Sequence, residues 1–269
     1  MCSKFLFDKY LNLLRVDKGE PTFERLNQIV RAHLIRVPFE NISKLLYKKQ
    51  GMNYIPDLLT YLQGIEKFNF GGTCYANNYY LYLLLQHLGY NIKLCGANMK
   101  NPDVHLISIV TIDDKEFIVD GGYAAPFFNP LRTDLDEDYI IDFSNERYIV
   151  KPKDDLGRIK VEQYYVGTLQ HWYTANPQSR KIEEFQKVIE DSYSDNAVFM
   201  NAIRITKFSE NGLLVLKNLT LTENSGNKSS TIKISRAKIP KVIEEKFEMP
   251  SDVVKEAIDS IKELKDIYD

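Results

Sequence analysis

Hydrophobic residues recur with a helical period in the first third of the chain and with a strand period after it. Apolar side chains three or four positions apart predict four helices, at residues 5–14, 23–34, 55–63 and 75–88. Pro38 ends the second of these patterns and leaves Phe39, Glu40 and Asn41 in an expected turn. Gly89 is suited to end the fourth helix, because glycine readily takes the left-handed conformation that follows a helix.

Short segments rich in β-branched and aromatic residues follow from residue 91. They predict strands at residues 92–98, 105–112, 115–120, 139–143, 147–150 and 159–166. Because these strands are short and closely spaced, we expect a small antiparallel sheet or barrel.

The last part of the chain mixes the two patterns. Residues 179–192 predict a polar helix that connects the halves of the chain. Strands are expected at residues 199–208, 213–222 and 231–235, with a polar loop at residues 224–230. Pro250 starts a terminal helix whose apolar stripe comprises Val254, Ile258, Ile261 and Leu264.

Composition indicates an ordinary globular protein. The sequence has 269 residues, of which 44% are hydrophobic and 27% charged, and a chain of this size fits two or three modest subdomains. A net charge of −2, without a stripe of lysine or arginine, argues against a nucleic-acid partner. The most apolar run, residues 81–97, is interrupted by polar residues, so no membrane span is expected.

Cysteine and histidine positions bear on compartment and metal content. Cys2, Cys74 and Cys95 form no C-x-x-C pair, and no signal peptide is evident at the N-terminus. Free thiols without an export signal indicate a cytoplasmic protein. The four histidines are scattered and lack the spacing of a metal site, so no metal is expected. The oligomeric state does not follow from the sequence.

The segment Phe70-Gly71-Gly72-Thr73-Cys74 carries the strongest chemical signal. It delivers a cysteine to the first turn of the fourth predicted helix. Backbone N–H groups and the positive end of the helix dipole meet at such a position, and both favour the nucleophilic thiolate. A lone cysteine at a helix start is more often structural, so the interpretation depends on partners elsewhere in the chain.

A hairpin provides those partners. If Asp113 and Asp114 form a two-residue turn, Asp120 lies opposite residue 107, on the face of the sheet that also carries His105. The two residues are then diagonal neighbours roughly 7–8 Å apart at the backbone, within reach of a side-chain hydrogen bond. A three-residue turn would place them on opposite faces.

Cys74, His105 and Asp120 together predict a thiol enzyme with a cysteine-protease-like triad. The histidine takes the thiol proton, and the aspartate fixes the imidazole tautomer and stabilises the imidazolium. The backbone N–H of Cys74 is a candidate donor to an oxyanion. His105 alone fits an ordinary sheet histidine, and Asp120 alone fits a turn residue; their order and register favour catalysis.

These residues resemble the arylamine N-acetyltransferase family. The similarity lies in the triad motifs Gly71-Gly72-Thr73-Cys74, His105 and Asp120-Gly121-Gly122-Tyr123, and in the family hallmark Pro38-Phe39-Glu40-Asn41. It implies an α+β fold in three parts: an N-terminal helical bundle at residues 1–90, an antiparallel β-barrel with a linker helix at residues 91–192, and a C-terminal α/β lid at residues 193–269.

The resemblance also implies ping-pong acyl transfer. Cys74 would take an acetyl group from acetyl-CoA, and an arylamine, hydrazine or hydroxylamine would attack the thioester while His105 relays protons. Acetyl-CoA would be a co-substrate. The positions that match substrate- or coenzyme-binding motifs of the family are Phe39, Gly72, Thr73, Gly121, Gly122, Tyr123 and Ala124.

Three departures from the family pattern stand out. Phe70 replaces an arginine that is expected to pair with Glu40, which leaves this carboxylate without an evident cation. Tyr123 replaces a phenylalanine and adds a hydroxyl beside the acceptor site. Ala124 replaces a glycine near the expected path of coenzyme A.

Other hypotheses share the triad. An amide synthase of the same fold would transfer another acyl group to an aromatic amine, and the changes at Phe70 and Ala124 permit this. A hydrolase or transglutaminase-like enzyme uses the same groups, although the hallmark at residues 38–41 argues against it. A binding protein that has lost catalysis fits an intact triad least well.

Overall fold

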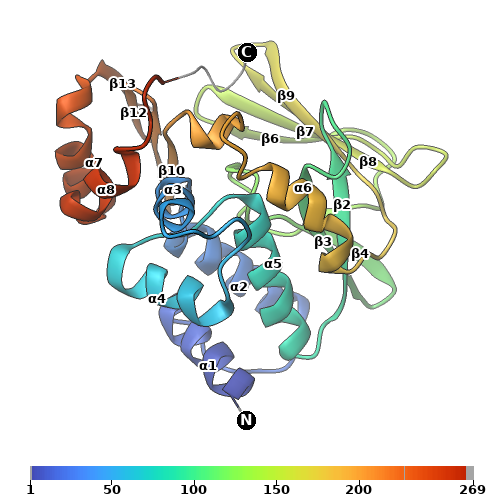
Figure 1. Cartoon of the computed structure of the whole chain (residues 1–269). Helices are drawn as coiled ribbons and strands as arrows, with labels where there is room; N and C mark the ends of the chain where they lie inside the picture. The colour runs from blue at the N-terminus through green and yellow to red at the C-terminus, as the bar shows by residue number, and fades with distance from the viewer. Residues whose placement is uncertain (1, 227, 265–269) are drawn as a thin grey trace.

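The computed structural model describes residues 2–226 and 228–264, with the side chains of residues 2 and 3 outside the description (Figure 1). In these residues, five helices form one end of the molecule, and two antiparallel sheets and three further helices form the rest. The architecture is α+β, as the sequence predicts, and the larger sheet curls into a half-barrel (Figure 1).

The helical end contains all four expected helices and one that the sequence pattern missed. The helices are α1 Cys2–Leu14, α2 Phe23–Arg36, α3 Ile42–Lys49, α4 Leu58–Phe68 and α5 Cys74–His87. Helix α4 starts three residues later than expected, because the Asp57 side chain caps it by accepting from the backbone N–H of Thr60. Gly89 has φ of 89°, so it takes the left-handed conformation expected after α5.

The sequence pattern did not predict helix α3, because the start of this helix depends on Glu40, two positions before it. The Glu40 carboxylate accepts hydrogen bonds from the backbone N–H and the hydroxyl of Ser43 at 2.9 and 2.5 Å. A carboxylate in this position satisfies free N–H groups of the first turn and complements the helix dipole. The helix is therefore started by a residue of the preceding strand.

The larger sheet contains the expected strands in antiparallel order β5-β4-β3-β2-β9-β8-β7-β6. Their bounds are β2 Asn91–Asn98, β3 His105–Ile112, β4 Lys115–Val119, β5 Leu131–Arg132, β6 Tyr139–Phe143, β7 Glu146–Val150, β8 Ile159–Tyr165 and β9 Thr168–Ala175. The sequence did not predict β5 and β9. Strand β9 bridges the two halves of the sheet, since it pairs with both β2 and β8.

The smaller sheet joins the two ends of the chain. It has the order β1-β10-β11-β12-β13, in which β1 is Phe39–Glu40 and the others are β10 Arg204–Ser209, β11 Gly212–Lys217, β12 Thr220–Ser225 and β13 Lys228–Lys233. The expected turn at residues 39–41 is therefore wrong: Phe39 and Glu40 pair with Thr206 and Ile205 of β10. The pairing partner lies far away in sequence, so local patterns did not reveal it.

Two further expectations for the C-terminal part were wrong. The strand expected at residues 213–222 is split into β11 and β12 at Asn218, whose φ of 52° lies in the left-handed region. The loop expected at residues 224–230 instead belongs largely to β12 and β13, which turn around Gly226. Residue 227, part of the same expected loop, lies outside the described residues.

The helices after the larger sheet differ in part from expectation. The connector comprises the 3₁₀ turn η1 Ile182–Phe185 and helix α6 Gln186–Asp191. A second 3₁₀ turn, η2 Val198–Met200, replaces the start of the strand expected at residues 199–208. Helix α8 Ser251–Ile258 begins after Pro250 as predicted, whereas α7 Ile239–Phe247 was missed.

Packing between these parts positions the site. Helix α5 lies against β2 and β3, while α3 packs on α8 (Figure 1).

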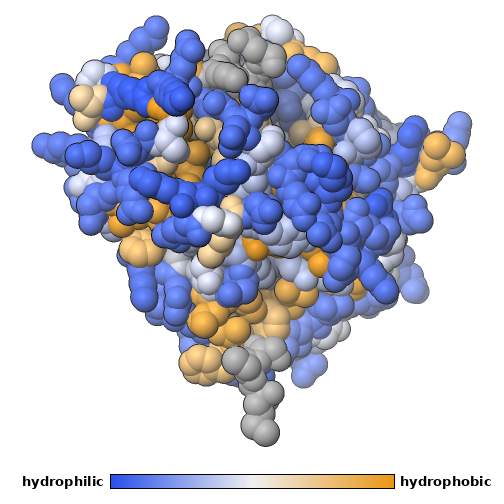
Figure 2. All heavy atoms as spheres, viewed as in Figure 1, coloured by the Kyte–Doolittle hydropathy of each residue, from blue (hydrophilic) through white to orange (hydrophobic). Residues whose placement is uncertain are grey.

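The face shown in Figure 2 is mostly hydrophilic, with separate hydrophobic areas. In the described part of the chain, no helix is long and apolar enough to cross a bilayer.

Candidate active site

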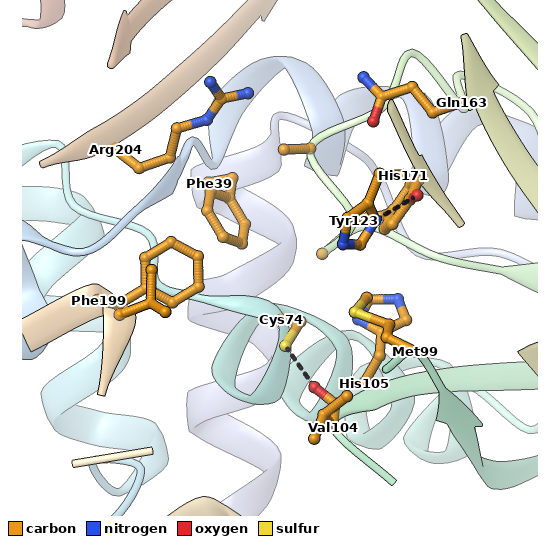
Figure 3. A pocket seen from close by; sticks show the side chains of 13 residues that line it. Phe39, Cys74, Met99, Val104, His105, Tyr123, Gln163, His171, Phe199 and Arg204 are labelled. Atoms are coloured by element: carbon orange, nitrogen blue, oxygen red, sulfur yellow. Dashed lines mark hydrogen bonds between the residues drawn. The ribbon is translucent and has the colours of Figure 1, made fainter. Parts of the chain in front are cut away.

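A cavity of about 220 Å³ lies where the helices, the half-barrel and β10 meet (Figure 3). Aromatic side chains form much of its wall, and Cys74 and His105 lie on one side of it (Figure 3). The residues that line it are Phe39, Cys74, Met99, Val104, His105, Gly122, Tyr123, Ala124, Gln163, His171, Val198, Phe199 and Arg204.

Cys74 occupies the first turn of α5, as expected. Thr73 is the N-cap residue, yet its side chain accepts no hydrogen bond from this turn in the described structure. The N–H groups at the helix start are therefore not used by a side-chain cap of Thr73. The thiol is half-buried and donates to the Val104 carbonyl at 3.8 Å.

The hairpin has the register expected for a two-residue turn, which places His105 and Asp120 on the same face of the sheet. Strand β3 pairs with β4 from Ile112 opposite Lys115 to Ser108 opposite Val119. Asp113 and Asp114 form the two-residue turn, with φ of 48° and 60°. Next to the strand end, His105 Nε2 lies 2.8 Å from Asp120 Oδ2, so the predicted contact between these two residues is confirmed.

Asp120 is held from several directions. Its Oδ1 accepts from the Asn78 side-chain amide at 2.9 Å and from the Gly122 backbone N–H at 3.0 Å. Burial by itself would raise the pKa of Asp120, but the charge and hydrogen bond of His105 and the Asn78 amide outweigh it and keep the pKa below its usual value. The carboxylate is therefore ionised and fixed.

The same pair determines the charge of His105. Burial by itself would lower the pKa of this imidazole, but the charge and hydrogen bond of Asp120, together with Cys74, raise it to about 10. The ring is therefore an imidazolium at neutral pH. Its Nδ1 is buried and has no hydrogen-bond partner among the described residues, and the Cys74 side chain lies next to the ring (Figure 3).

Asn78 was not recognised from the sequence. It lies one helical turn after Cys74 and joins α5 to the hairpin, because its Oδ1 also accepts from the backbone N–H of Gly121 at 2.8 Å. The available signal was the pair of asparagines in an otherwise apolar helix. The neighbouring Asn77 has a similar linking role: its amide donates to the Pro38 carbonyl, and its oxygen accepts from the Tyr61 hydroxyl.

The structure separates the seven expected binding residues into two groups. Phe39, Gly122, Tyr123 and Ala124 line the cavity. The other three, namely Gly72, Thr73 and Gly121, are buried beside the cavity and do not line it.

The glycines allow close packing within the protein itself. A Cβ on Gly71 would lie 1.9 Å from the Pro38 carbonyl oxygen, and one on Gly72 would lie 2.9 Å from the Ala76 Cβ. A Cβ on Gly122 would lie 2.8 Å from the Cys74 Cα. The motif glycines thus allow the hallmark strand, helix α5 and the aspartate loop to approach one another.

Glu40 is satisfied without a cation. It is fully buried and, besides Ser43, accepts from the backbone N–H of Gly71 at 3.1 Å. It forms no ion pair within the described part of the chain. Burial raises the pKa of this carboxyl, and the hydrogen bonds from the start of α3 and from Gly71 oppose the rise. The donors to this carboxyl include the backbone N–H groups of Ser43 and Gly71 and the Ser43 hydroxyl.

Phe70, at the position of that arginine, belongs to an apolar core. It is 1% exposed, and its ring packs against those of Tyr47 and Phe68. The change from arginine to phenylalanine is thus accompanied by a local structure that hydrogen-bonds Glu40 through its backbone.

The substitutions near the cavity have defined effects. The Tyr123 hydroxyl lies 2.8 Å from His171 Nδ1, and this contact spans one wall of the cavity (Figure 3). Ala124 has φ of 61°, a conformation that costs an alanine roughly 1 kcal/mol relative to glycine. Its methyl group also takes up space that a glycine would leave open.

Several lining residues have no local sequence signal. Met99, Val104, Gln163, His171, Val198 and Arg204 come from three different regions of the chain. Phe199 falls in the segment that the family resemblance pointed to, but without a specific match. Within the described residues, no group of three or more histidine, cysteine or acidic side chains is arranged to hold a metal ion.

Comparison with known proteins agrees with the fold and the motifs. A family model described as N-acetyltransferase matches residues 22–255. The chain is 34% identical over 116 residues to a pineal-gland arylamine N-acetyltransferase isozyme of Gallus gallus. This alignment covers 40% of this chain and 39% of that enzyme. It is 26% identical over 133 residues to proansamycin X synthase of Amycolatopsis mediterranei, covering 46% of this chain and 51% of the synthase.

A solved structure extends the similarity over the whole fold. The arylamine N-acetyltransferase of Mycobacterium marinum in complex with CoA superposes with a TM-score of 0.78 at 18% identity, covering 95% of this chain and 99% of that one. These two sequence alignments span about half or less of the relatives concerned, whereas the family model and the fold cover most of the chain. The chain belongs to the arylamine N-acetyltransferase family.

Proposed function

We propose that this protein transfers an acetyl group from acetyl-CoA to an arylamine, a hydrazine or an N-hydroxyarylamine through a thioester on Cys74. The observation that carries the proposal is the Asp120–His105 pair beside Cys74 in a cavity lined by aromatic side chains. The family assignment and the CoA complex of the Mycobacterium marinum relative support acetyl-CoA as donor. We also infer a cytoplasmic enzyme, consistent with the free thiols of Cys74 and Cys95.

The first half-reaction acylates the enzyme. The imidazolium of His105 already holds the proton given up by Cys74, so the pair enters the reaction as thiolate and imidazolium, and the thiolate attacks the carbonyl carbon of acetyl-CoA. Backbone N–H groups at the start of α5 stabilise the oxyanion. The C–S bond to coenzyme A then breaks, and the imidazolium returns its proton to the departing thiolate. Asp120 remains ionised throughout and holds the ring in place.

The second half-reaction transfers the acetyl group. An arylamine nitrogen is unprotonated at neutral pH, so it attacks the Cys74 thioester directly. His105 takes a proton from the attacking nitrogen and gives it to the Cys74 sulfur as the C–S bond breaks. The products are the N-acetylated amine and the free thiol. Phe39 and Phe199, whose rings lie 5.6 Å apart, offer an aromatic wall for the acceptor ring.

Intact-mass spectrometry tests this function. After incubation with acetyl-CoA, the wild type gains one acetyl group on Cys74 and loses it when an arylamine is added. Cys74→Ala gains none and does not acetylate the amine, while Cys95→Ala serves as the matched control because Cys95 is fully buried away from the cavity. Equal amine acetylation by wild type and Cys74→Ala contradicts the proposal.

The same assay separates the competing functions. Release of free acetate or cleavage of a model amide without an amine acceptor indicates a hydrolase. Tight binding of coenzyme A without any acylation of Cys74 indicates a binding protein. An amide synthase is the second candidate, favoured by the similarity to proansamycin X synthase and by the changes at Phe70 and Ala124. It predicts that a longer acyl thioester acylates Cys74 faster than acetyl-CoA does.

A further inference from the structure

The cavity contains an arginine that no other side chain neutralises. Arg204 is the first residue of β10 and lines the cavity together with Cys74. Its guanidinium forms no hydrogen bond or ion pair with the described residues, in contrast to its backbone. None of the described residues that line the cavity is acidic. A cation in such a wall has its attraction available for a ligand.

The backbone of Arg204 is fixed. Its N–H donates to the Asn41 side-chain oxygen at 2.8 Å, and its carbonyl accepts from the Asn41 backbone N–H at 3.2 Å. The Asn41 amide also donates to the carbonyls of Phe199 and Ala202. The hallmark asparagine therefore holds the backbone of the arginine at a defined position on the cavity wall.

The other titratable groups of the cavity compete little with Arg204. His105 opposite is an imidazolium, since its pKa is raised to about 10, but the ionised Asp120 at 2.8 Å balances its charge. Burial, followed by repulsion from His105, Lys100 and Arg204, lowers the pKa of His171 to about 4. Burial is the largest cause of this shift, so His171 is neutral at pH 7 and adds no charge, and Arg204 is the lining cation that an anionic substrate group meets.

The length of a ligand that reaches from Cys74 to Arg204 indicates which anion the arginine binds. In Figure 3, Arg204 lies on one side of the cavity and Gln163 on the other, both away from Cys74. The phosphates of coenzyme A are separated from its sulfur by the long pantetheine arm, whereas the cavity measures only about 220 Å³. A ligand that reaches both the sulfur and the guanidinium must be short, with its reacting group at one end and its charge at the other.

We propose that Arg204 binds a carboxylate of the substrate, so that this enzyme prefers a substrate with an anionic group at the end remote from the reacting atom. This inference rests on the proposed acyl transfer. The guanidinium fork matches a carboxylate in a bidentate contact. The carboxylate has two possible sources: the far end of a dicarboxylic acyl group carried by the thioester, or a ring substituent of the acceptor amine.

Two series of matched substrates distinguish these sources. The donor series compares succinyl-CoA with butyryl-CoA, measured as the rate of Cys74 acylation by intact mass. The acceptor series compares 4-aminobenzoate with its methyl ester, measured as kcat/KM with acetyl-CoA. In the wild type we expect the carboxylate to be preferred by roughly 10- to 100-fold in one series, the range typical of a charged hydrogen bond.

Variants assign the preference to the arginine. Arg204→Met is expected to remove most of the preference in that series, and Arg204→Lys to retain only part of it because a lysine lacks the fork. Arg204→Gln provides a second neutral variant if the methionine variant folds poorly. The matched control is Lys217→Met, because Lys217 lies directly opposite Arg204 on β11, carries the same charge and does not line the cavity; it is expected to keep the wild-type ratio.

Failure of this inference is distinguishable from failure of the proposed function. If no thioester acylates Cys74, the acyl-transfer mechanism itself is wrong. If Cys74 is acylated and amines are acetylated, but neither carboxylate ratio differs between wild type and Arg204→Met, the role of Arg204 is refuted. An equal rise in KM for every CoA thioester in Arg204→Met also refutes it, because the arginine then serves the coenzyme phosphates.

Discussion

At the scale of single residues, Glu40 and Phe70 show how one substitution is accommodated. The sequence suggests that Glu40 lacks a partner because the expected arginine is absent. In the structure, the carboxylate accepts from Ser43 and Gly71, and Phe70 fills an apolar core beside it. The residue type at position 70 therefore does not show whether the buried Glu40 carboxylate is hydrogen-bonded. The backbone donors around the carboxylate decide this.

Restoring the arginine should accordingly weaken the fold. Phe70→Arg places a charge in the core formed with Tyr47 and Phe68, and Glu40 already has its donors. We expect the free energy of unfolding to fall by roughly 2–4 kcal/mol, measured by chemical denaturation. The control Phe70→Leu keeps an apolar side chain and should lose only about 1 kcal/mol. A Phe70→Arg variant as stable as the wild type would mean that Glu40 does need a cation.

At the scale of elements, the β3–β4 hairpin connects sequence and site most directly. Its two-residue turn and its register follow from alternation and turn chemistry, and together they place His105 against Asp120. Strand β1, by contrast, depends on pairing with β10 about 165 residues later, which no local pattern encodes.

The turn offers a test of this element. Asp113 and Asp114 both have positive φ, which is easier for glycine than for aspartate. Asp114→Gly should therefore raise the free energy of unfolding by about 0.5–1 kcal/mol and leave the acylation rate of Cys74 unchanged, as thermal unfolding and the intact-mass assay will show. Lys115→Gly, in the strand itself, should destabilise instead. A destabilised Asp114→Gly would contradict the proposed turn conformation.

At the scale of the whole molecule, burial couples several charges to stability. Lys44 of α3 is only 4% exposed; its ammonium donates to the Ser192 hydroxyl at 2.7 Å and lies 4.2 Å from the centre of the Tyr193 ring. Burial lowers its pKa from 10.5 to about 7, against an opposing effect of Cys74. The unfolded chain thus binds more protons than the folded protein between pH 7 and 10.5, so this group costs most stability at and below neutral pH.

Removing this charge should stabilise the protein in a pH-dependent way. We expect Lys44→Met to raise the free energy of unfolding by about 2 kcal/mol at pH 6.5 and by much less at pH 10, measured by denaturation at both values. Ser192 remains satisfied because its hydroxyl also donates to the Ile189 carbonyl. The control Lys48→Met, one turn further along the same helix and 39% exposed, should change little at either pH. An equal gain at both pH values would rule out titration of Lys44 as the cause.

The proposed nucleophile Cys74, its base His105 and the carboxylate of Asp120 could be predicted from the sequence alone, because each depends on local structure: a helix start, a strand start and a two-residue turn. It also carried the family motifs, which span residues 38–41 and 71–123. Only the tertiary structure decided what surrounds them. It placed Arg204, Gln163 and His171 around Cys74, hydrogen-bonded Glu40 through backbone donors and joined β1 to β10. These features depend on contacts between residues far apart in the chain, where packing and burial, rather than local periodicity, determine which side chains meet.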